Sequence, residues 1–160
     1  MVHRLVVPAF ICATLMTTFA ATPAAKSPAW LSIESPVSPY NPTERGALFL
    51  VHATLPGSVP ELSSLSGSAE GLVNGTRKSI AIRFDATNRP GTYAVRKQWD
   101  GDGVWLVRVS LSATTALVTF DRNGDVASAR VPAVPGAGTL LPRPVSAREI
   151  DSLLAESAKR

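Results

Sequence analysis

Apolar and polar residues alternate along much of the chain, and this pattern predicts short, half-buried β-strands. The clearest example is residues 89–111, where two alternating segments flank the acidic glycine turn 100–103. One face of these segments carries large apolar side chains: Tyr93, Val95, Trp99, Trp105, Val107, Val109 and Leu111. We therefore expect an antiparallel hairpin with one buried and one solvated face.

Further strands are expected at residues 30–34, 46–55, 69–73, 76–85, 115–120 and 126–131. Asn74-Gly75 is a strong hairpin signal, because both residues tolerate the positive φ of a type I′ turn. The strand at 46–55 is apolar on both faces, which indicates a central strand or one covered by another element.

The spacing of these strands predicts the fold class. The 13 prolines and 11 glycines are spread along the chain, as turns between many short strands require. We expect an all-β fold, an immunoglobulin-like antiparallel β-sandwich over residues 30–132. A chain of 160 residues has room for one such domain.

The C-terminal part has a different character. Residues 133–145 are rich in Pro and Gly and are predicted to be a linker. Residues 146–160 are predicted to form a short amphipathic helix, since Ser146 and Glu149 fit a capping box and Ile150, Leu153 and Leu154 form one apolar stripe. A helix of this length must dock, either on its own sandwich or on a partner.

The N-terminal residues 1–25 are predicted to be a signal peptide. A short positive region precedes an apolar run at 5–19, which is followed by small residues. The sole cysteine, Cys12, lies in this leader, so no disulfide or Cys-based metal site is expected afterwards. We expect a secreted or periplasmic protein, with a membrane association only if the leader stays uncleaved as an anchor.

The net charge of +4 is spread over the chain without a run of Lys or Arg. Because a basic stripe with interleaved aromatic residues is missing, no nucleic-acid partner is expected. Strand parity points Arg83, Arg96 and Arg108 away from the core. We predict that they share an exposed sheet face, which is one candidate surface for a protein or cell-envelope partner. The alternative surface is the helix stripe Ile150, Leu153 and Leu154.

Candidates for catalysis are few. His52 is the single histidine beyond the leader, and it lies mid-strand among leucines. One histidine without cysteine or methionine cannot build a zinc or copper site. No Gly-x-Ser-x-Gly nucleophile motif is present. We expect no cofactor and no enzymatic activity.

Two acidic turns are weak calcium candidates: Asp100 and Asp102 in one, and Asp121, Asn123 and Asp125 in the other. Alternating oxygen ligands suit Ca²⁺, but the second loop lacks a bidentate Glu at the twelfth position. Asp, Asn and Gly also serve tight turns for backbone reasons, which is the favoured interpretation.

The sequence thus predicts a non-enzymatic binding module for a protein or envelope partner, or alternatively an accessory carbohydrate- or calcium-binding module. The segments Pro-Gly-Thr-Tyr-Ala-Val and Gly-Val-Trp-Leu-Val-Arg-Val, between residues 90 and 109, resemble extracytoplasmic YtkA-like and FixH-like domains. The resemblance implies a small immunoglobulin-like sandwich. Some members of that group are linked to copper handling or oxidase assembly, but the His and Met residues of such a role are missing here, so no functional residue is implied.

Overall fold

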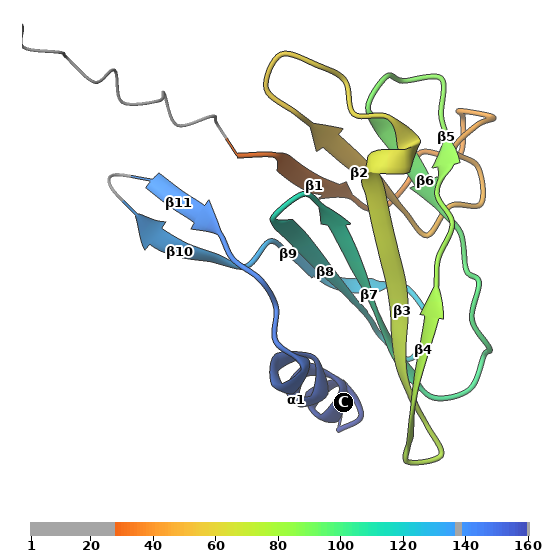
Figure 1. Cartoon of the computed structure of the whole chain (residues 1–160). Coiled ribbons are helices and arrows are strands. Elements are labelled where there is room, and N and C mark those ends of the chain that lie inside the picture. Colours follow the sequence, from red (N-terminus) through yellow and green to blue (C-terminus); the bar gives the residue numbers. More distant parts are fainter. Residues whose placement is uncertain (1–27, 137–138, 160) are drawn as a thin grey trace, which may run out of the picture.

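The computed structural model describes residues 28–136 and 139–159, which form two packed antiparallel sheets with one helix (Figure 1). The four-stranded sheet contains, in spatial order, β1 (Trp30–Glu34), β2 (Phe49–Thr54), β6 (Thr92–Val95) and β5 (Asp85–Ala86). The five-stranded sheet contains β4 (Thr76–Ala81), β3 (Leu65–Val73), β7 (Val104–Leu111), β8 (Thr114–Phe120) and β9 (Val126–Arg130). The predicted all-β sandwich is confirmed; the predicted signal peptide lies outside the described residues.

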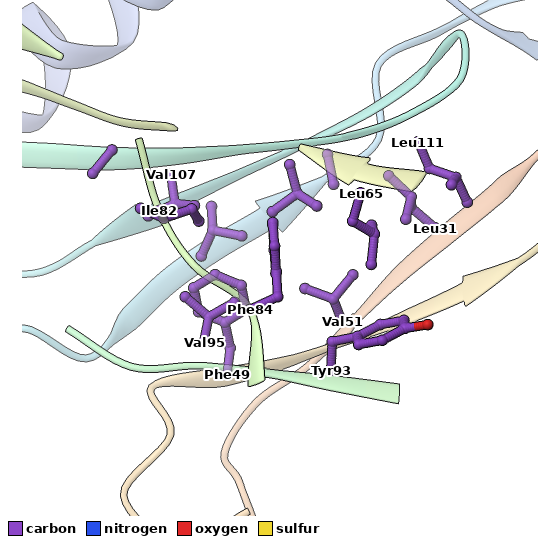
Figure 2. Close-up of a cluster of buried hydrophobic side chains, with 14 of the residues drawn as sticks. Leu31, Phe49, Val51, Leu65, Ile82, Phe84, Tyr93, Val95, Val107 and Leu111 are labelled. Carbon is purple, nitrogen blue, oxygen red and sulfur yellow. The ribbon is translucent and has the colours of Figure 1, made fainter. Parts of the chain in front are cut away.

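The core lies between the two sheets, as Figure 2 shows. Phe49, Val51 and Val95 from the four-stranded sheet are fully buried against Val107 and Val109 from the five-stranded sheet. Val95, Val107 and Val109 are positions that the alternation assigned to the buried face, because successive side chains on a strand point to opposite faces.

The pairing of residues 89–111 differs from the prediction. The expected hairpin is wrong: β6 pairs with β2 and β5, whereas β7 pairs with β3 and β8 in the other sheet. The connection 96–103 crosses between the sheets. The assignment of Tyr93, Trp99 and Trp105 to the buried face is nevertheless correct. A period of two specifies the buried face of a strand, but not the strand that lies beside it.

One other segment also changes sheets. The predicted strand 76–85 is divided, because β4 ends at Ala81 and Asp85 belongs to β5 in the opposite sheet. Between them, Ile82 and Phe84 are buried as the chain crosses. The Asn74-Gly75 hairpin is confirmed, with φ of 50° and 76° at the two residues.

The predicted linker 133–145 contains a small two-stranded sheet, β10 (Ala133–Gly136) and β11 (Thr139–Pro142). A two-stranded sheet tolerates Pro135 and Pro142, because each strand has a free side where no N–H donor is needed. The backbone N–H of Arg143 donates to the carbonyl of Pro132 and closes this hairpin.

Helix α1 (Ala147–Ser157) covers the outer face of the five-stranded sheet (Figure 1). Ser146 caps it as predicted, accepting a hydrogen bond from the backbone N–H of Glu149 at 3.2 Å. Ile150 and Leu154 pack against Leu106 and Leu117. The helix therefore docks on its own sandwich.

The outer face of the four-stranded sheet is crossed by residues 35–48, which we call the crossing segment. Leu50 and Ala94 point to this face and are fully buried, as expected beneath such a segment. This accounts for the apolar residues on both faces of β2, which also lies centrally between β1 and β6 as predicted.

Candidate functional site

A groove of about 630 Å³ runs along the edge of β9, and we call it the edge groove. One wall is formed by residues 124–129 of the five-stranded sheet. The other comes from β1 and the crossing segment, with Ile33, Val37 and Leu48 as its apolar side chains. The groove thus lies where the two sheets separate at one side of the sandwich.

Strand β9 is the last strand of its sheet and pairs only with β8. Ala127, Ser128 and Ala129 are exposed and small, and the strand contains no proline. Its one charged residue, Arg130, is turned toward α1, with its guanidinium 3.5 Å from the Glu149 carboxylate. The free side of β9 therefore has no charged side chain and no proline to prevent another strand from pairing with it.

The other edges of the two large sheets differ from β9 in length or in side chains. The opposite edge strand, β4, carries Arg77 and Lys78, and charged residues of this kind discourage edge pairing. Strand β5 has only two residues. Strand β1 carries the larger side chains Trp30, Leu31, Ile33 and Glu34, and the Ala29 carbonyl just before it accepts the Thr114 hydroxyl. Among the edges of the two large sheets, β9 is the one with three consecutive small, uncharged and exposed residues along a groove.

A second cavity of about 570 Å³, the aromatic pocket, lies between the connection 96–103 and the β8–β9 loop. Its apolar wall is formed by Trp99, Trp105 and Phe120, with ring centroids 6.1 Å apart for the two tryptophans and 5.3 Å apart for Trp99 and Phe120. The Trp105 indole N–H donates to the Asp102 carbonyl at 2.8 Å, which fixes the ring beside the pocket.

The rim of the aromatic pocket carries two cationic side chains. Lys97 and Arg122 line it and are exposed. Within residues 28–136 and 139–159, neither side chain has a hydrogen bond or ion pair. The one lining carboxylate, Asp121, uses its Oδ1 to accept from the backbone N–H groups of Asn123 and Asp125, at 2.8 and 3.0 Å.

The two acidic turns lie at the same end of the sandwich, since residues of both line the aromatic pocket. Asp121 nevertheless has a turn role, because it accepts from its own loop backbone. Over the described part of the chain, no group of three or more His, Cys, Asp or Glu side chains is placed to hold a metal ion. The geometry favours turn formation for Asp121, Asn123 and Asp125, whereas Asp100 and Asp102 lie beside and in a bend of the connection 96–103.

The three predicted arginines do not form one surface. Arg96 is bound to Asp85 and to the carbonyls of Thr43 and Arg45 in the crossing segment. Arg108 is half-buried on the outward side of β7, in the other sheet. Arg83 is exposed between β4 and β5. The prediction of a shared face is therefore wrong, because it assumed that the strands belong to one sheet.

The helix residues also need correction as a partner surface. Ile150 and Leu154 are 4% and 2% exposed against the chain's own sheet. Leu153 is half-buried and packs on the same cluster. The apolar stripe follows helical periodicity as predicted, but it is covered within the domain.

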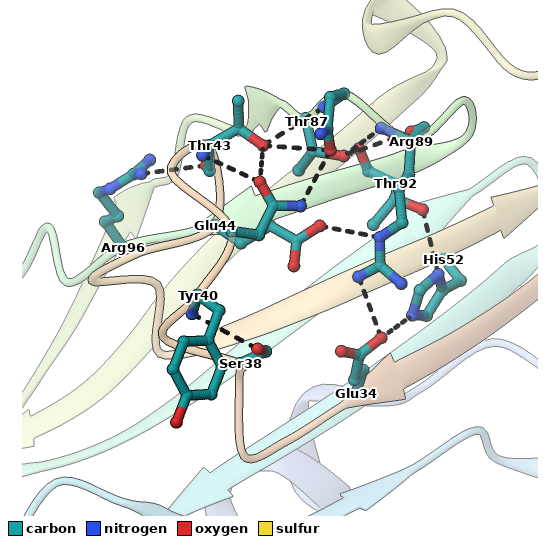
Figure 3. A network of polar contacts seen from close by, with 12 residues as sticks. Glu34, Ser38, Tyr40, Thr43, Glu44, His52, Thr87, Arg89, Thr92 and Arg96 are labelled. Carbon is teal, nitrogen blue, oxygen red and sulfur yellow. Dashed lines mark hydrogen bonds and ion pairs between the residues drawn. The ribbon is translucent and has the colours of Figure 1, made fainter.

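A polar network around His52 was not predicted from the sequence (Figure 3). His52 Nε2 lies 2.8 Å from Glu34 Oε2 on β1, and Nδ1 lies 3.1 Å from the Thr92 hydroxyl on β6. Arg89 donates to both Glu34 and the buried Glu44 of the crossing segment, at 3.1 and 2.8 Å. These contacts hold the crossing segment on the sheet.

Burial alone would raise the pKa of Glu34, but hydrogen bonds and charges from His52 and Arg89 outweigh it and leave the pKa below its ordinary value of 4.5. A hydroxyl, an imidazole and a carboxylate in a row resemble the parts of a nucleophilic site. Thr92 is 5% exposed, however, and neither of the two cavities borders it. The network is positioned to stabilise the crossing segment.

Comparison with family models, curated proteins and solved structures gave no match to this chain. The resemblance to YtkA-like and FixH-like domains therefore stays a prediction. Over the described residues, no helix has the length and apolar character needed to cross a bilayer.

Proposed function

We propose that this chain is a non-enzymatic binding module that takes an extended segment of a partner protein onto the free edge of β9. The observation that carries the proposal is the unprotected edge of β9 beside the edge groove. Extended segments add to such edges through backbone hydrogen bonds, while pockets for alternate side chains provide specificity.

The side chains around the edge suit this mode of binding. Ala127 and Ala129 leave room for an approaching backbone, and Ala129 stands opposite the core-facing Val118 in the β8–β9 register. Every second side chain of an added strand would therefore point between the sheets, toward Ile33, Val37 and Leu48. Burial of these residues would add hydrophobic stabilisation to the backbone pairing.

The absence of a reaction is part of the same proposal. The hydroxyl of Thr92 is enclosed, and the imidazole of His52 is held between Thr92 and Glu34. A catalytic constellation needs space for a reacting atom about 3 Å from both the nucleophile and an oxyanion donor. The cavities lie elsewhere, at the β9 edge and beside the tryptophans.

We also propose that the protein acts outside the cytoplasm, in the periplasm or after secretion, because residues 1–25 have the pattern of a signal peptide. N-terminal sequencing of the protein isolated from culture medium or a cell-envelope fraction tests this. A mature chain that begins between residues 21 and 26 is expected. Recovery of the chain from the cytoplasm with residues 1–25 intact would contradict it.

Strand addition is tested with a photo-reactive cross-linker at Ala129, and at Ala155 on the exposed side of α1 as a control, in the native envelope. We expect the cross-linker at position 129 to capture one discrete protein. The cross-linker at position 155 should not capture that protein. Ala129→Lys places an ammonium group in the edge groove and should abolish capture of that protein, whereas Ala155→Lys should not.

A synthetic peptide covering the cross-linked region of the partner supplies the direct measurement. When it binds, amide hydrogen exchange should slow across residues 126–130, because pairing protects the N–H groups of an edge strand. Unchanged exchange in β9, or equal capture by Ala129→Lys and Ala155→Lys, would overturn the proposal.

A further inference from the structure

The edge groove and the aromatic pocket meet at the β8–β9 loop, since Leu48, Gly124 and Ala127 line both cavities. A segment paired with β9 that continues past Val126 therefore reaches the aromatic pocket. The residue that arrives there enters a cavity of about 570 Å³, which has room for a large side chain. The side chains that line the aromatic pocket would therefore select which residue of the partner segment binds there.

The walls favour an inserted ring over a sugar lying on an open platform. Trp99 and Trp105 are only 9% and 5% exposed, so their broad faces are largely covered by the core. Trp99 and Phe120, whose rings are tilted by 48° to each other, both line the pocket and form its aromatic wall. Such walls bind an aromatic side chain through edge and offset contacts.

The rim adds a charge requirement. Lys97 and Arg122 are unpaired in the described structure, and the single lining carboxylate is occupied by its own loop. An acidic group at this rim would meet two cations without displacing an existing ion pair. Arg in particular favours carboxylates, to which it donates two hydrogen bonds.

We propose that the segment recognised by this chain carries an aromatic residue with an Asp or Glu two positions from it, the ring seated in the aromatic pocket and the carboxylate at Lys97 and Arg122. This inference rests on the proposed function, because it assigns the partner's side chains at the end of the strand that pairs with β9. Side chains two positions apart lie on the same face of a strand, which brings ring and carboxylate to one cavity.

A displayed library of random ten-residue segments, selected against the mature protein, tests the inference. We expect selected segments to contain an aromatic residue and an acidic residue two positions apart. For a synthetic selected peptide, Ala in place of the aromatic residue should weaken binding by about tenfold or more, since buried aromatic anchors dominate such interfaces.

The double variant Lys97→Ala, Arg122→Ala tests the charged rim. It should weaken binding of the same peptide by about fivefold and reduce the salt dependence. Its matched control is Lys78→Ala, Arg83→Ala, which removes two exposed cations that do not line the pocket and should leave affinity unchanged.

The outcomes separate the two proposals. One outcome would support strand addition and overturn this inference. In that outcome, the selected peptides contain no aromatic–acidic pair, and Ala129→Lys abolishes their binding. The double variant Lys97→Ala, Arg122→Ala binds them with unchanged affinity. Selected peptides that bind Ala129→Lys unchanged would overturn strand addition itself. Saturable binding of glucuronate or galacturonate oligosaccharides that depends on Lys97 and Arg122, with no peptide selected, would replace the inference by an acidic-sugar site.

Discussion

Trp105 lies directly opposite Gly71 in the β3–β7 register, and its indole occupies the space that a side chain at position 71 would need. A Cβ atom at Gly71 would stand 2.5 Å from the Trp105 ring. The shape of the aromatic pocket thus depends on the missing side chain of a residue in a neighbouring strand.

Gly71→Ala should therefore destabilise the fold by about 2 kcal/mol, because the added methyl group overpacks the site and displaces the indole. Urea denaturation followed by tryptophan fluorescence measures this. Gly101→Ala is the control, since nothing lies within 4 Å of a Cβ there. Equal stability of the two variants would show that Trp105 moves without cost.

Arg89→Ala should reduce the free energy of unfolding by about 3 kcal/mol, because it leaves the Glu44 carboxylate, 3% exposed, without its ion-pair partner. Calorimetry or denaturant titration measures the loss, with Arg83→Ala as the control for an exposed arginine. Adding Glu44→Gln to Arg89→Ala should restore part of the stability. If the double variant is less stable than Arg89→Ala, the unpaired charge of Glu44 is not the cause of the loss in Arg89→Ala.

Acid should destabilise the protein below about pH 4.5. Burial alone would raise the pKa of Glu70, but hydrogen bonds from Ser68, Ser79 and Arg77 outweigh it and lower the pKa from its ordinary 4.5. The unfolded chain then binds more protons than the native chain, so this stability is present above pH 4.5 and is lost as pH falls through the lower native pKa.

Denaturant titrations between pH 6 and pH 3 measure this dependence. Glu70→Gln should show a shallower fall in stability below pH 4.5 than the wild-type chain, since one of the linked protons is removed. The hydrogen bond from Arg143 likewise lowers the pKa of Glu149, so some acid dependence should remain. If Glu70→Gln and the wild-type chain show the same dependence of stability on pH, Glu70 is not a source of the acid dependence.

Leu154→Ala should cost about 3 kcal/mol, because Leu154 is 2% exposed and its removal leaves a cavity against Leu106 and Leu117. Leu153→Ala, at a half-buried position of the same helix, should cost clearly less. Thermal unfolding of both variants compares them. Equal losses would mean that α1 does not dock in the orientation described.

Asp121→Ala should lower stability by about 1 kcal/mol through the loss of its two backbone hydrogen bonds. Millimolar Ca²⁺ should leave the melting temperature of the wild-type chain unchanged, because the carboxylate already serves the turn. A calcium-dependent rise in melting temperature that Asp121→Ala removes would restore the calcium interpretation.

The polar network around His52 shows a limit of prediction from the sequence. Glu34, His52 and Arg89 are widely separated in the chain, and each is an ordinary polar residue in its local pattern. The register places His52 opposite Ser32 on one side and Thr92 on the other. No signal in a single sequence specifies that register, so the network that holds the crossing segment could not be predicted.

The amino-acid sequence by itself determined most strands of the two large sheets, the buried side chains of residues 89–111, the Asn74-Gly75 turn and the capped C-terminal helix. These depend on local alternation, on backbone conformations at single residues and on short-range hydrogen bonds. Only the tertiary structure decided that β6 and β7 lie in different sheets, that α1 covers its own domain, and that β9 is the open edge. Strand partners are chosen by packing between residues distant in the chain, and a periodicity of two is the same whichever partner is chosen.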